Sequence, residues 1–380
     1  MSLTYYANIH KIYCNFVGMK KILLGLNPQE LKAVALSVGL PGFTGNQIAD
    51  WLYKKRVTSI DQMTNLSKVA REKLSAEWEV GRLEYSLVQE SVDGTKKYLF
   101  PCHTGTAIEA VMIPDGERKT LCVSSQAGCK MGCKFCMTGR QGFSGNLLAS
   151  EIISQYLSVD EAAELTNTVF MGMGEPLDNI EAVLRTIEIL TAPWGFGWSP
   201  KRITLSSIGV TKLATPVILN DYVDGNNNPY KCVNPLEAFL DLTKCHLAIS
   251  LHNPVSGERL ELMPMQKAFP IEETLRVIKR YDFTGQRRVS FEYTMFAGVN
   301  DSKKHADAIV RLLKGLECRM NLIRFHKIPD FPYETSSGVI IENFKQRLNN
   351  SGLTTTVRAS RGEDILAACG MLAGQHTGNA

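Results

Sequence analysis

Residues 120 to 139, TLCVSSQAGCKMGCKFCMTG, join an apolar β-like run to a glycine-rich loop that carries three cysteines. The cysteines are spaced as Cys129-x3-Cys133-x2-Cys136. A four-iron cube needs four ligands, so three thiolates leave one iron open for a substrate or cofactor, whereas a structural zinc site is normally closed by a fourth protein ligand. The spacing therefore indicates an iron–sulfur cluster that takes part in chemistry.

A closed zinc site is the alternative, because Cys122 lies close upstream and would supply a fourth thiolate. The loop itself favours the cluster. Gly128 and Gly132 let the backbone wrap a cube, and Phe135 offers an apolar wall that shields it. The CxxxCxxC spacing, with an aromatic residue before its last cysteine, resembles the radical S-adenosylmethionine (SAM) superfamily. In that superfamily the amino and carboxylate groups of SAM chelate the open iron.

The composition allows a large buried core and excludes few partners. Of 380 residues, 44% are hydrophobic, and 42 Lys and Arg against 38 Asp and Glu give a formal charge of +4. This charge is compatible with an anionic partner without requiring one. No apolar run reaches the roughly 18 residues of a membrane helix.

The cysteine content indicates a reducing compartment. Ten cysteines in a chain without a secretory signal favour metal binding or catalysis over disulfides, so we expect a cytoplasmic protein. Met19 is a candidate initiator, which would make residues 1–18 an extension.

From residue 120 onward, β-like runs alternate with amphipathic helical patterns. Such repeated units predict a parallel sheet that curls into a full or partial barrel, with the chemistry at the carboxyl ends of its strands. The predicted strands are residues 120–126, 167–173, 202–209, 246–252, 289–296, 320–326 and 354–360, and the clearest helices are 148–157, 179–190, 272–281 and 303–315.

The N-terminal part has a different pattern. Residues 1–79 predict a small helical accessory domain, since three helical patterns lie between Asn27 and Trp78. Residues 80–119 predict a small β element with a hairpin over the turn Asp93-Gly94.

The remaining chain divides into a core and a tail. We expect the core over 120–374 and a tail over 375–380. Residues 216–245 contain three consecutive asparagines and no clean period, which predicts a surface insertion.

The run VFMGMGEPLDN (169–179) leaves a strand through Gly172 and Gly174. Glycine lets a ligand approach the backbone closely, and Glu175 would accept a hydrogen bond from an ammonium group. An ordinary βα turn is the better explanation of the run when it is taken alone, since glycine is common in such turns. Beside the cysteine motif, binding of the SAM amino group becomes the better interpretation.

Several other residues have simple structural explanations. Cys369, like Cys14, Cys102, Cys232, Cys245 and Cys318, would by itself be a small buried hydrophobe. His252 and His326 end apolar strands, where a histidine is usually a structural hydrogen-bonding residue. Glu109 interrupts an apolar strand, which indicates either a raised pKa or an exposed strand face.

Together, several motifs resemble one family closely: the dual-specificity radical SAM adenine-C2 RNA methyltransferases, which act on 23S ribosomal RNA and transfer RNA. The resemblance extends from about Lys21 to Gly374 and implies a radical SAM partial (β/α)6-type barrel. The motifs are TLCVSSQAGCKMGCKFCMTGRQGF, FMGMGEPLDN, RITLSSIGV, LAISLH, GVNDS and VRASRGEDILAACG.

The resemblance implies roles for residues that the pattern alone leaves unassigned. Cys369 matches the methyl-carrying cysteine, Cys122 the cysteine that forms a disulfide with it at turnover, and Glu109 the proton acceptor. The chain departs from the family at His326, where an asparagine is usual, so its contact with SAM is the least supported. The positions matching the SAM-binding residues are Gly174, Glu175, Ser206, Ser250, Leu251, His252 and His326.

The implied chemistry explains why a radical is needed, since C2 of adenine is not nucleophilic. One SAM methylates Cys369, and a second is cleaved reductively at a single [4Fe-4S] cluster to a 5′-deoxyadenosyl radical that activates the S-methyl group. Release of the methylated base by Cys122 leaves a disulfide. The implied partners are 23S rRNA, tRNA and an electron donor such as flavodoxin or ferredoxin, with no membrane, and we expect a monomer.

Loop adenines cost least to extrude into a buried site, so basic residues that hold RNA loops are expected. For each candidate, an ordinary solvated charge is at least as good an explanation. The candidates are Lys54, Lys55, Arg56, Lys96, Lys97, Arg118, Lys119, Arg287 and Arg288.

Three alternative functions remain open at this point. A related resistance branch methylates C8 of the same ribosomal adenosine, but it tends to have alanine where this chain has Pro176. A radical SAM enzyme with a peptide or small-molecule substrate would not need the N-terminal elements. An electron carrier would not need Cys369 and Cys122.

Overall fold

The computed structural model describes residues 20–285 and 287–373, so the expectations about Met19 and about the tail 375–380 fall outside its scope. The chain divides into two compact units. Unit 1 contains the described residues up to Leu83 with Leu148–Ser158 and Arg185–Trp198, and unit 2 contains Glu84–Leu147, Val159–Leu184 and the described residues from Ser199 onward.

Unit 1 begins with the helices that the sequence predicts. Asn27 caps the first of them in a capping box, because its side chain accepts a hydrogen bond from the Glu30 amide (3.0 Å) while the Glu30 carboxylate accepts one from the Asn27 amide (2.8 Å). Leu31, Ile48 and Leu74 are buried in the core of this unit. The elements are β1 (Lys21–Ile22), α2 (Pro28–Ser37), α3 (Thr44–Ala49), η1 (Asp50–Lys54), η2 (Ile60–Gln62), α4 (Lys68–Glu77) and β2 (Trp78–Glu79).

Unit 1 also includes α6 (Ala149–Ser158), a helix that the sequence predicts from its amphipathic pattern. The amide of Leu83 donates to Ser154 Oγ (3.0 Å), and Arg82 Nε donates to Ser158 Oγ (2.8 Å). The next helix, α7 (Ile180–Thr191), contributes its second half to this unit.

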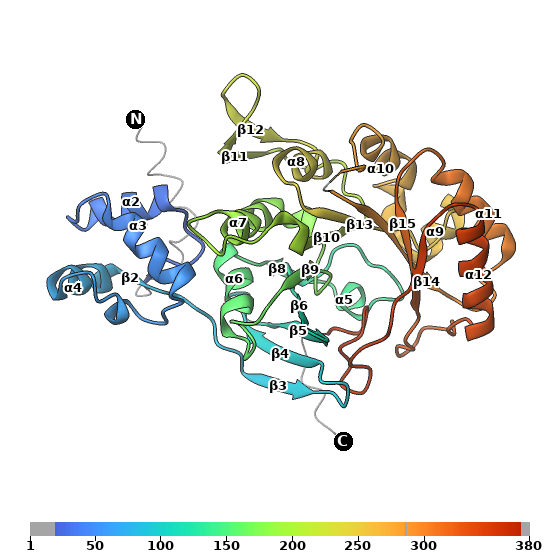
Figure 1. The fold of residues 1–380 in the computed structure, drawn as a ribbon, viewed down its shortest axis with the longest axis horizontal. Coiled ribbons are helices and arrows are strands. Elements are labelled where there is room, and N and C mark those ends of the chain that lie inside the picture. The colour runs from blue at the N-terminus through green and yellow to red at the C-terminus, as the bar shows by residue number, and fades with distance from the viewer. Residues whose placement is uncertain (1–19, 286, 374–380) are drawn as a thin grey trace. The chain divides into compact units, whose positions relative to one another are not determined.

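Unit 2 is organised by a ten-stranded sheet (Figure 1). Seven strands are parallel, as the alternation of β and α patterns predicts, and helices α8, α10, α11 and α12 cover the outer face of this half. The parallel strands run in the order β6 (Arg118–Cys122), β9 (Asn167–Phe170), β10 (Ile203–Ser207), β13 (His246–Ser250), β14 (Val289–Met295), β15 (Arg319–Arg324) and β16 (Thr355–Val357).

The other three strands extend the same sheet in antiparallel fashion beyond β6. They are β3 (Leu87–Glu90), β4 (Lys96–Pro101) and β5 (Ala107–Asp115). The hairpin expected over Asp93-Gly94 joins β3 to β4, and Gly94 has the positive φ of +80° that favours glycine. The β element predicted over 80–119 therefore continues the core sheet.

The remaining helices connect the strands of unit 2. They are α9 (Ser256–Leu262), α10 (Ile271–Ile278), α11 (Lys303–Leu312) and α12 (Gly338–Asn350), with short 3-10 turns η3 (Pro176–Asn179), η4 (Pro200–Arg202) and η5 (Pro264–Lys267). Among the described residues, no helix combines the length and apolar character needed to cross a membrane.

The prediction that residues 216–245 are one surface insertion is wrong in its second half. The hairpin of β11 (Val217–Val223) and β12 (Pro229–Cys232) is the irregular part. It is followed by α8 (Pro235–Leu242), which buries Leu236 and Phe239 completely and is the crossover helix between β10 and β13. Eight residues are too few to show a helical period, and only the cap of Asn234 before Pro235 marked its start.

Candidate active site

The cysteine loop is held between two short strands. β7 (Gln126–Gly128) pairs with β8 (Phe143–Asn146), and α5 (Met137–Arg140) lies between them. Gly128 has φ +78°, and a Cβ there would stand 2.1 Å from the carbonyl oxygen of Gly142. Only glycine allows this close approach, so the tight loop that the glycines predict is present.

Cys129, Cys133 and Cys136 line one cavity of about 170 Å³. Burial raises the pKa of all three thiols, that of Cys129 to about 12. A bound metal deprotonates coordinating thiols outright. Three thiols that converge on one cavity and need a cation to ionise fit the open-iron cluster that the spacing indicates.

The glycine-rich turn after β9 lines the same cavity. Gly174 has φ +100°, and a Cβ there would lie 2.5 Å from the Cβ of Gln126. Glu175 is 3% exposed and accepts hydrogen bonds from the amides of Leu177 (3.1 Å) and Ile208 (3.0 Å). Burial raises the pKa of Glu175 to about 7 despite these donors.

The ends of β10 and β13 contribute the predicted serines and histidine. Ser206, Ser250 and His252 line the cavity, whereas the Leu251 side chain is buried in the core. Burial lowers the pKa of His252 to about 3, so its ring is neutral. Its Nδ1 accepts a hydrogen bond from the Thr294 amide (3.0 Å), and its ring packs at 4.8 Å from that of Phe135.

His326, the position that departs from the family, also lines the cavity. Its Nε2 lies 3.1 Å from Ser360 Oγ, and its Nδ1 lies 3.7 Å from the Glu363 carboxylate. Burial lowers its pKa, which favours the neutral ring. The histidine is thus placed where a hydrogen bond to a ligand is geometrically possible.

Cys369 opens into the same cavity as the three cluster cysteines. The segment that carries it is fastened to the cluster loop, since the Met137 amide donates to the Gly370 carbonyl (2.8 Å) and Thr138 Oγ1 donates to the Leu372 carbonyl (2.7 Å). Cys122 is buried at the end of β6, and burial raises its pKa to about 12. The charges acting on its thiol come from Cys369 and Arg358, not from the cluster cysteines.

Glu109 lies in β5 and is 2% exposed. Its Oε1 is 3.1 Å from Lys97 Nζ, and its Oε2 accepts a hydrogen bond from the Ala373 amide at 2.7 Å. Glu109 is therefore a buried, ion-paired carboxylate that contacts the segment carrying Cys369, and the alternative of an exposed strand face is wrong.

Two of the basic residues listed as RNA candidates are structural. Lys97 is 6% exposed and pairs with Glu109, and Arg287 is 7% exposed and donates to the carbonyls of Leu240 and Thr243. A buried cation that already has partners cannot reach an RNA backbone. Of the others, Lys54 and Lys55 pair with Asp50, Lys96 with Asp160 and Glu161, and Lys119 with Glu164.

Two further arginines, at positions that the sequence motifs do not single out, lie at or near the site. Arg358, just after β16, lines the cavity together with Cys369 and lies 3.4 Å from the Glu292 carboxylate. Arg259 is 1% exposed and donates to the carbonyls of Leu251 (3.0 Å) and Ser250 (2.9 Å). Both arginines follow the carboxyl ends of parallel strands, which is the signal that would have found them.

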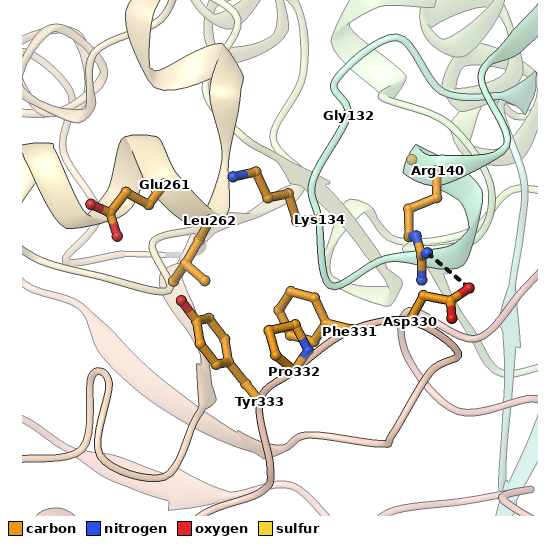
Figure 2. A pocket seen from close by; sticks show the side chains of 10 residues that line it. Gly132, Lys134, Arg140, Glu261, Leu262, Asp330, Phe331, Pro332 and Tyr333 are labelled. Atoms are coloured by element: carbon orange, nitrogen blue, oxygen red, sulfur yellow. Dashed lines mark ion pairs between the residues drawn. The ribbon is translucent and has the colours of Figure 1, made fainter.

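A second cavity, of about 490 Å³, lies against the same loop (Figure 2). Phe331, Pro332 and Tyr333 form one wall, and Lys134 and Leu262 lie across from them. Arg140 pairs with Asp330 at its edge (3.9 Å). The ring of Phe331 contacts that of Phe325, which contacts Phe296, and Phe296 contacts Phe135 of the cluster loop.

A parallel (β/α) sheet with three cluster cysteines and a glycine–glutamate turn at its strand ends defines a radical SAM enzyme. The family model of the radical SAM superfamily matches residues 123–309, and that of the ribosomal RNA large subunit methyltransferase N-terminal domain matches residues 22–80. Enzymes of this superfamily use a [4Fe-4S] cluster and SAM, and so does this one. The closed zinc site is thereby excluded.

Similar proteins identify the family within the radical SAM superfamily. A probable dual-specificity RNA methyltransferase RlmN from Porphyromonas gingivalis is 55% identical over 353 residues, which is 93% of this chain and 94% of the relative. The dual-specificity RNA methyltransferase RlmN of Syntrophus aciditrophicus is 40% identical, covering 91% and 94%. The chain belongs to the RlmN family of dual-specificity RNA methyltransferases.

The fold agrees with a solved structure. The crystal structure of a radical SAM methyltransferase from Sphaerobacter thermophilus superposes with a TM-score of 0.81 at 36% identity, covering 93% of this chain and 99% of that one. The predicted fold class, α/β with a radical SAM partial barrel, is confirmed.

Proposed function

We propose that the enzyme methylates C2 of adenosine in 23S rRNA and tRNA, at the family-typical positions adenosine 2503 and adenosine 37. The observation that carries this proposal is that Cys369 shares one cavity with the three cluster cysteines. A radical generated at the cluster then needs no further transport to reach a carbon held on Cys369. Because its proposed substrates are ribosomal and transfer RNA, we also propose that the enzyme acts in the cytoplasm, as a monomer.

The bound cluster, once reduced, and SAM supply a radical that abstracts a hydrogen atom. In the proposed reaction, the Cys369 thiolate first takes a methyl group from one SAM and leaves S-adenosylhomocysteine. The S-methyl group of Cys369 then loses a hydrogen atom, which leaves a radical on the carbon bonded to the sulfur. This carbon adds to C2 of the adenine. Glu109 then takes the C2 proton, and the ring regains its aromatic system when the adduct also loses one electron, for which the oxidised cluster would be the acceptor.

Release of the product is assigned to Cys122. Its thiolate attacks the Cys369 sulfur, the bond from sulfur to the methylene carbon breaks, and that carbon keeps the electron pair and takes up a proton to become the methyl group. The cysteines end as a disulfide, which a two-electron reductant must open before the next turnover. Arg358 supports this assignment, because its positive charge acts on both thiols and favours their ionised form.

The cluster needs one-electron reduction, and we propose a flavodoxin or ferredoxin as the donor. The cavity of Figure 2 supports docking of the donor protein at this face. Lys134 lines the cavity, is exposed, lies between two cluster cysteines in the sequence, and attracts an acidic carrier. The aromatic contacts link the same cavity to Phe135 of the cluster loop.

The function is tested with anaerobically reconstituted enzyme, SAM, unmodified 23S rRNA or tRNA, and either flavodoxin, ferredoxin or dithionite as reductant. Mass spectrometry of nuclease digests should find 2-methyladenosine, formed at the expense of two SAM per product. The alternative C8 reaction would give 8-methyladenosine, which separates by chromatography. Absence of both nucleosides with either RNA would overturn the proposal. A Cys369→Ala variant, which lacks the proposed methyl carrier, is the negative control.

SAM affinity is expected to fall as the pH drops below about 7, because burial raises the pKa of Glu175 to about 7. Above this pH the carboxylate is ionised and attracts the SAM ammonium group, and below it SAM must displace a proton. The dissociation constant should rise about tenfold per pH unit on the acid side. Equilibrium dialysis measures it, and Glu175→Gln should bind more weakly at pH 8 and lack this dependence. A wild-type affinity that is constant with pH would contradict the role of Glu175.

A further inference from the structure

Lys97 and Glu109 face the same side of the sheet. In the register between β4 and β5, Lys97 lies opposite Val111 and Leu99 lies opposite Glu109, so all four side chains point to one face. Val111 in turn lies opposite Cys122 of β6, which places the Cys122 side chain on this face as well. Lys96 and Tyr98 point to the opposite face, where both contact Glu161.

The ion pair between Lys97 and Glu109 is almost fully buried. Nζ and Oε1 are 3.1 Å apart, and the two side chains are 6% and 2% exposed. Isolated charges at such depth are strongly disfavoured, and a carboxyl group without a counter-charge would bind a proton instead. Lys97 therefore provides a counter-charge for the buried Glu109 carboxylate.

The second carboxylate oxygen is also engaged. Oε2 accepts a hydrogen bond from the amide of Ala373 (2.7 Å), four residues after Cys369. The carboxylate is thus fixed between a cation on β4 and the segment that carries Cys369. A base held from both sides keeps a constant position relative to the carbon bound on Cys369.

We propose that Lys97 is a positioning residue for the proton transfer: it holds the Glu109 carboxylate oriented to take the C2 proton. The inference rests on the proposed function of Glu109 as the base. The proton goes from C2 to a Glu109 oxygen, and the electron pair of the broken bond stays in the adenine ring. The methylation of Cys369 itself does not use Glu109, so it provides an internal measure of an intact site.

The test compares Lys97→Met with Lys97→Arg in the reconstituted enzyme. Lys97→Met should still load a methyl group on Cys369, seen as the mass increase of the intact protein, at close to the wild-type extent. Its formation of 2-methyladenosine at neutral pH should fall roughly 100-fold, since general-base catalysis contributes at least this much. Lys97→Arg keeps the positive charge and should restore most of the product.

The split between the two readouts separates positioning from a structural role. A loss of folding would reduce methyl loading and product together, whereas a misplaced Glu109 reduces product alone. Should Lys97→Met fail to fold, Lys97→Gln is less apolar, lacks the charge as well, and gives the same readout. The control is Lys345→Met, which removes the exposed pair with Glu342 on α12 and should change neither activity.

Two outcomes would overturn the inference. One is a Lys97→Met enzyme that makes 2-methyladenosine at the wild-type rate. The other is a parallel loss of methyl loading and product in a folded variant, which would make the pair purely structural. Absence of 2-methyladenosine from the wild type in the same assay would instead overturn the proposed function.

Discussion

Replacing Cys122 with alanine is expected to leave the RNA covalently attached to Cys369. Without the Cys122 thiolate nothing attacks the Cys369 sulfur, so each enzyme molecule stops after one addition to C2. Free 2-methyladenosine should fall about 100-fold or more, as is usual when a nucleophile is removed. A denaturing gel should show a protein–RNA band that persists without reductant and disappears after nuclease digestion.

The trapped band depends on Cys369 and on the reduced cluster. It should be absent from the double variant Cys122→Ala with Cys369→Ala, and absent when either SAM or the reductant is omitted. Cys318→Ala removes a cysteine outside the cavity and should turn over normally. If Cys122→Ala releases product at the wild-type rate, Cys122 is not the releasing group.

Replacing Arg259 with methionine is expected to destabilise unit 2 severely. The guanidinium is 1% exposed and donates to the carbonyls of Ser250, Leu251 and Ile208 and to Gln266. Burial lowers its pKa to about 10, so it remains charged at neutral pH. Methionine leaves these buried acceptors without donors, which should cost about 3–5 kcal/mol of unfolding free energy.

Chemical denaturation followed by circular dichroism measures this loss. The same variant should bind SAM weakly, since Arg259 holds together the strand ends that bear Ser250 and follow Ser206. Arg347→Met, which breaks the exposed pair with Asp307, is the matched control and should change little. A stable Arg259→Met protein with normal SAM affinity would show that the strand ends hold their positions without it.

Much of this architecture could be predicted from local sequence. The alternation of β and α patterns and the cysteine loop each depend on neighbouring residues. The parallel strands could therefore be predicted directly, and the three cysteines predicted to hold the cluster line one cavity. The crossover helix α8 was missed because its eight residues follow an irregular hairpin. A helix this short has too few turns to establish a period.

The partners of buried charges were less predictable. Lys97 and Glu109 are 12 residues apart, and only the register of β4 against β5 brings them together. The hairpin between β3 and β4 was predicted from its turn, but nothing in the turn after β4 specifies the next pairing. Lys97 was therefore grouped with possible RNA contacts, although its strand position pairs it with Glu109.

Strand β6 has a consequence for how such enzymes can diversify. It pairs in parallel with β9 on one side and antiparallel with β5 on the other. Because of this reversal, the amino end of β5, with Glu109, meets the same edge as the carboxyl ends of the cofactor-binding strands. If Glu109 is the base proposed here, the parallel half of the sheet holds the predicted cluster ligands and the antiparallel half holds the base. Exchanging the antiparallel strands would then redirect which carbon is modified without rebuilding the radical source.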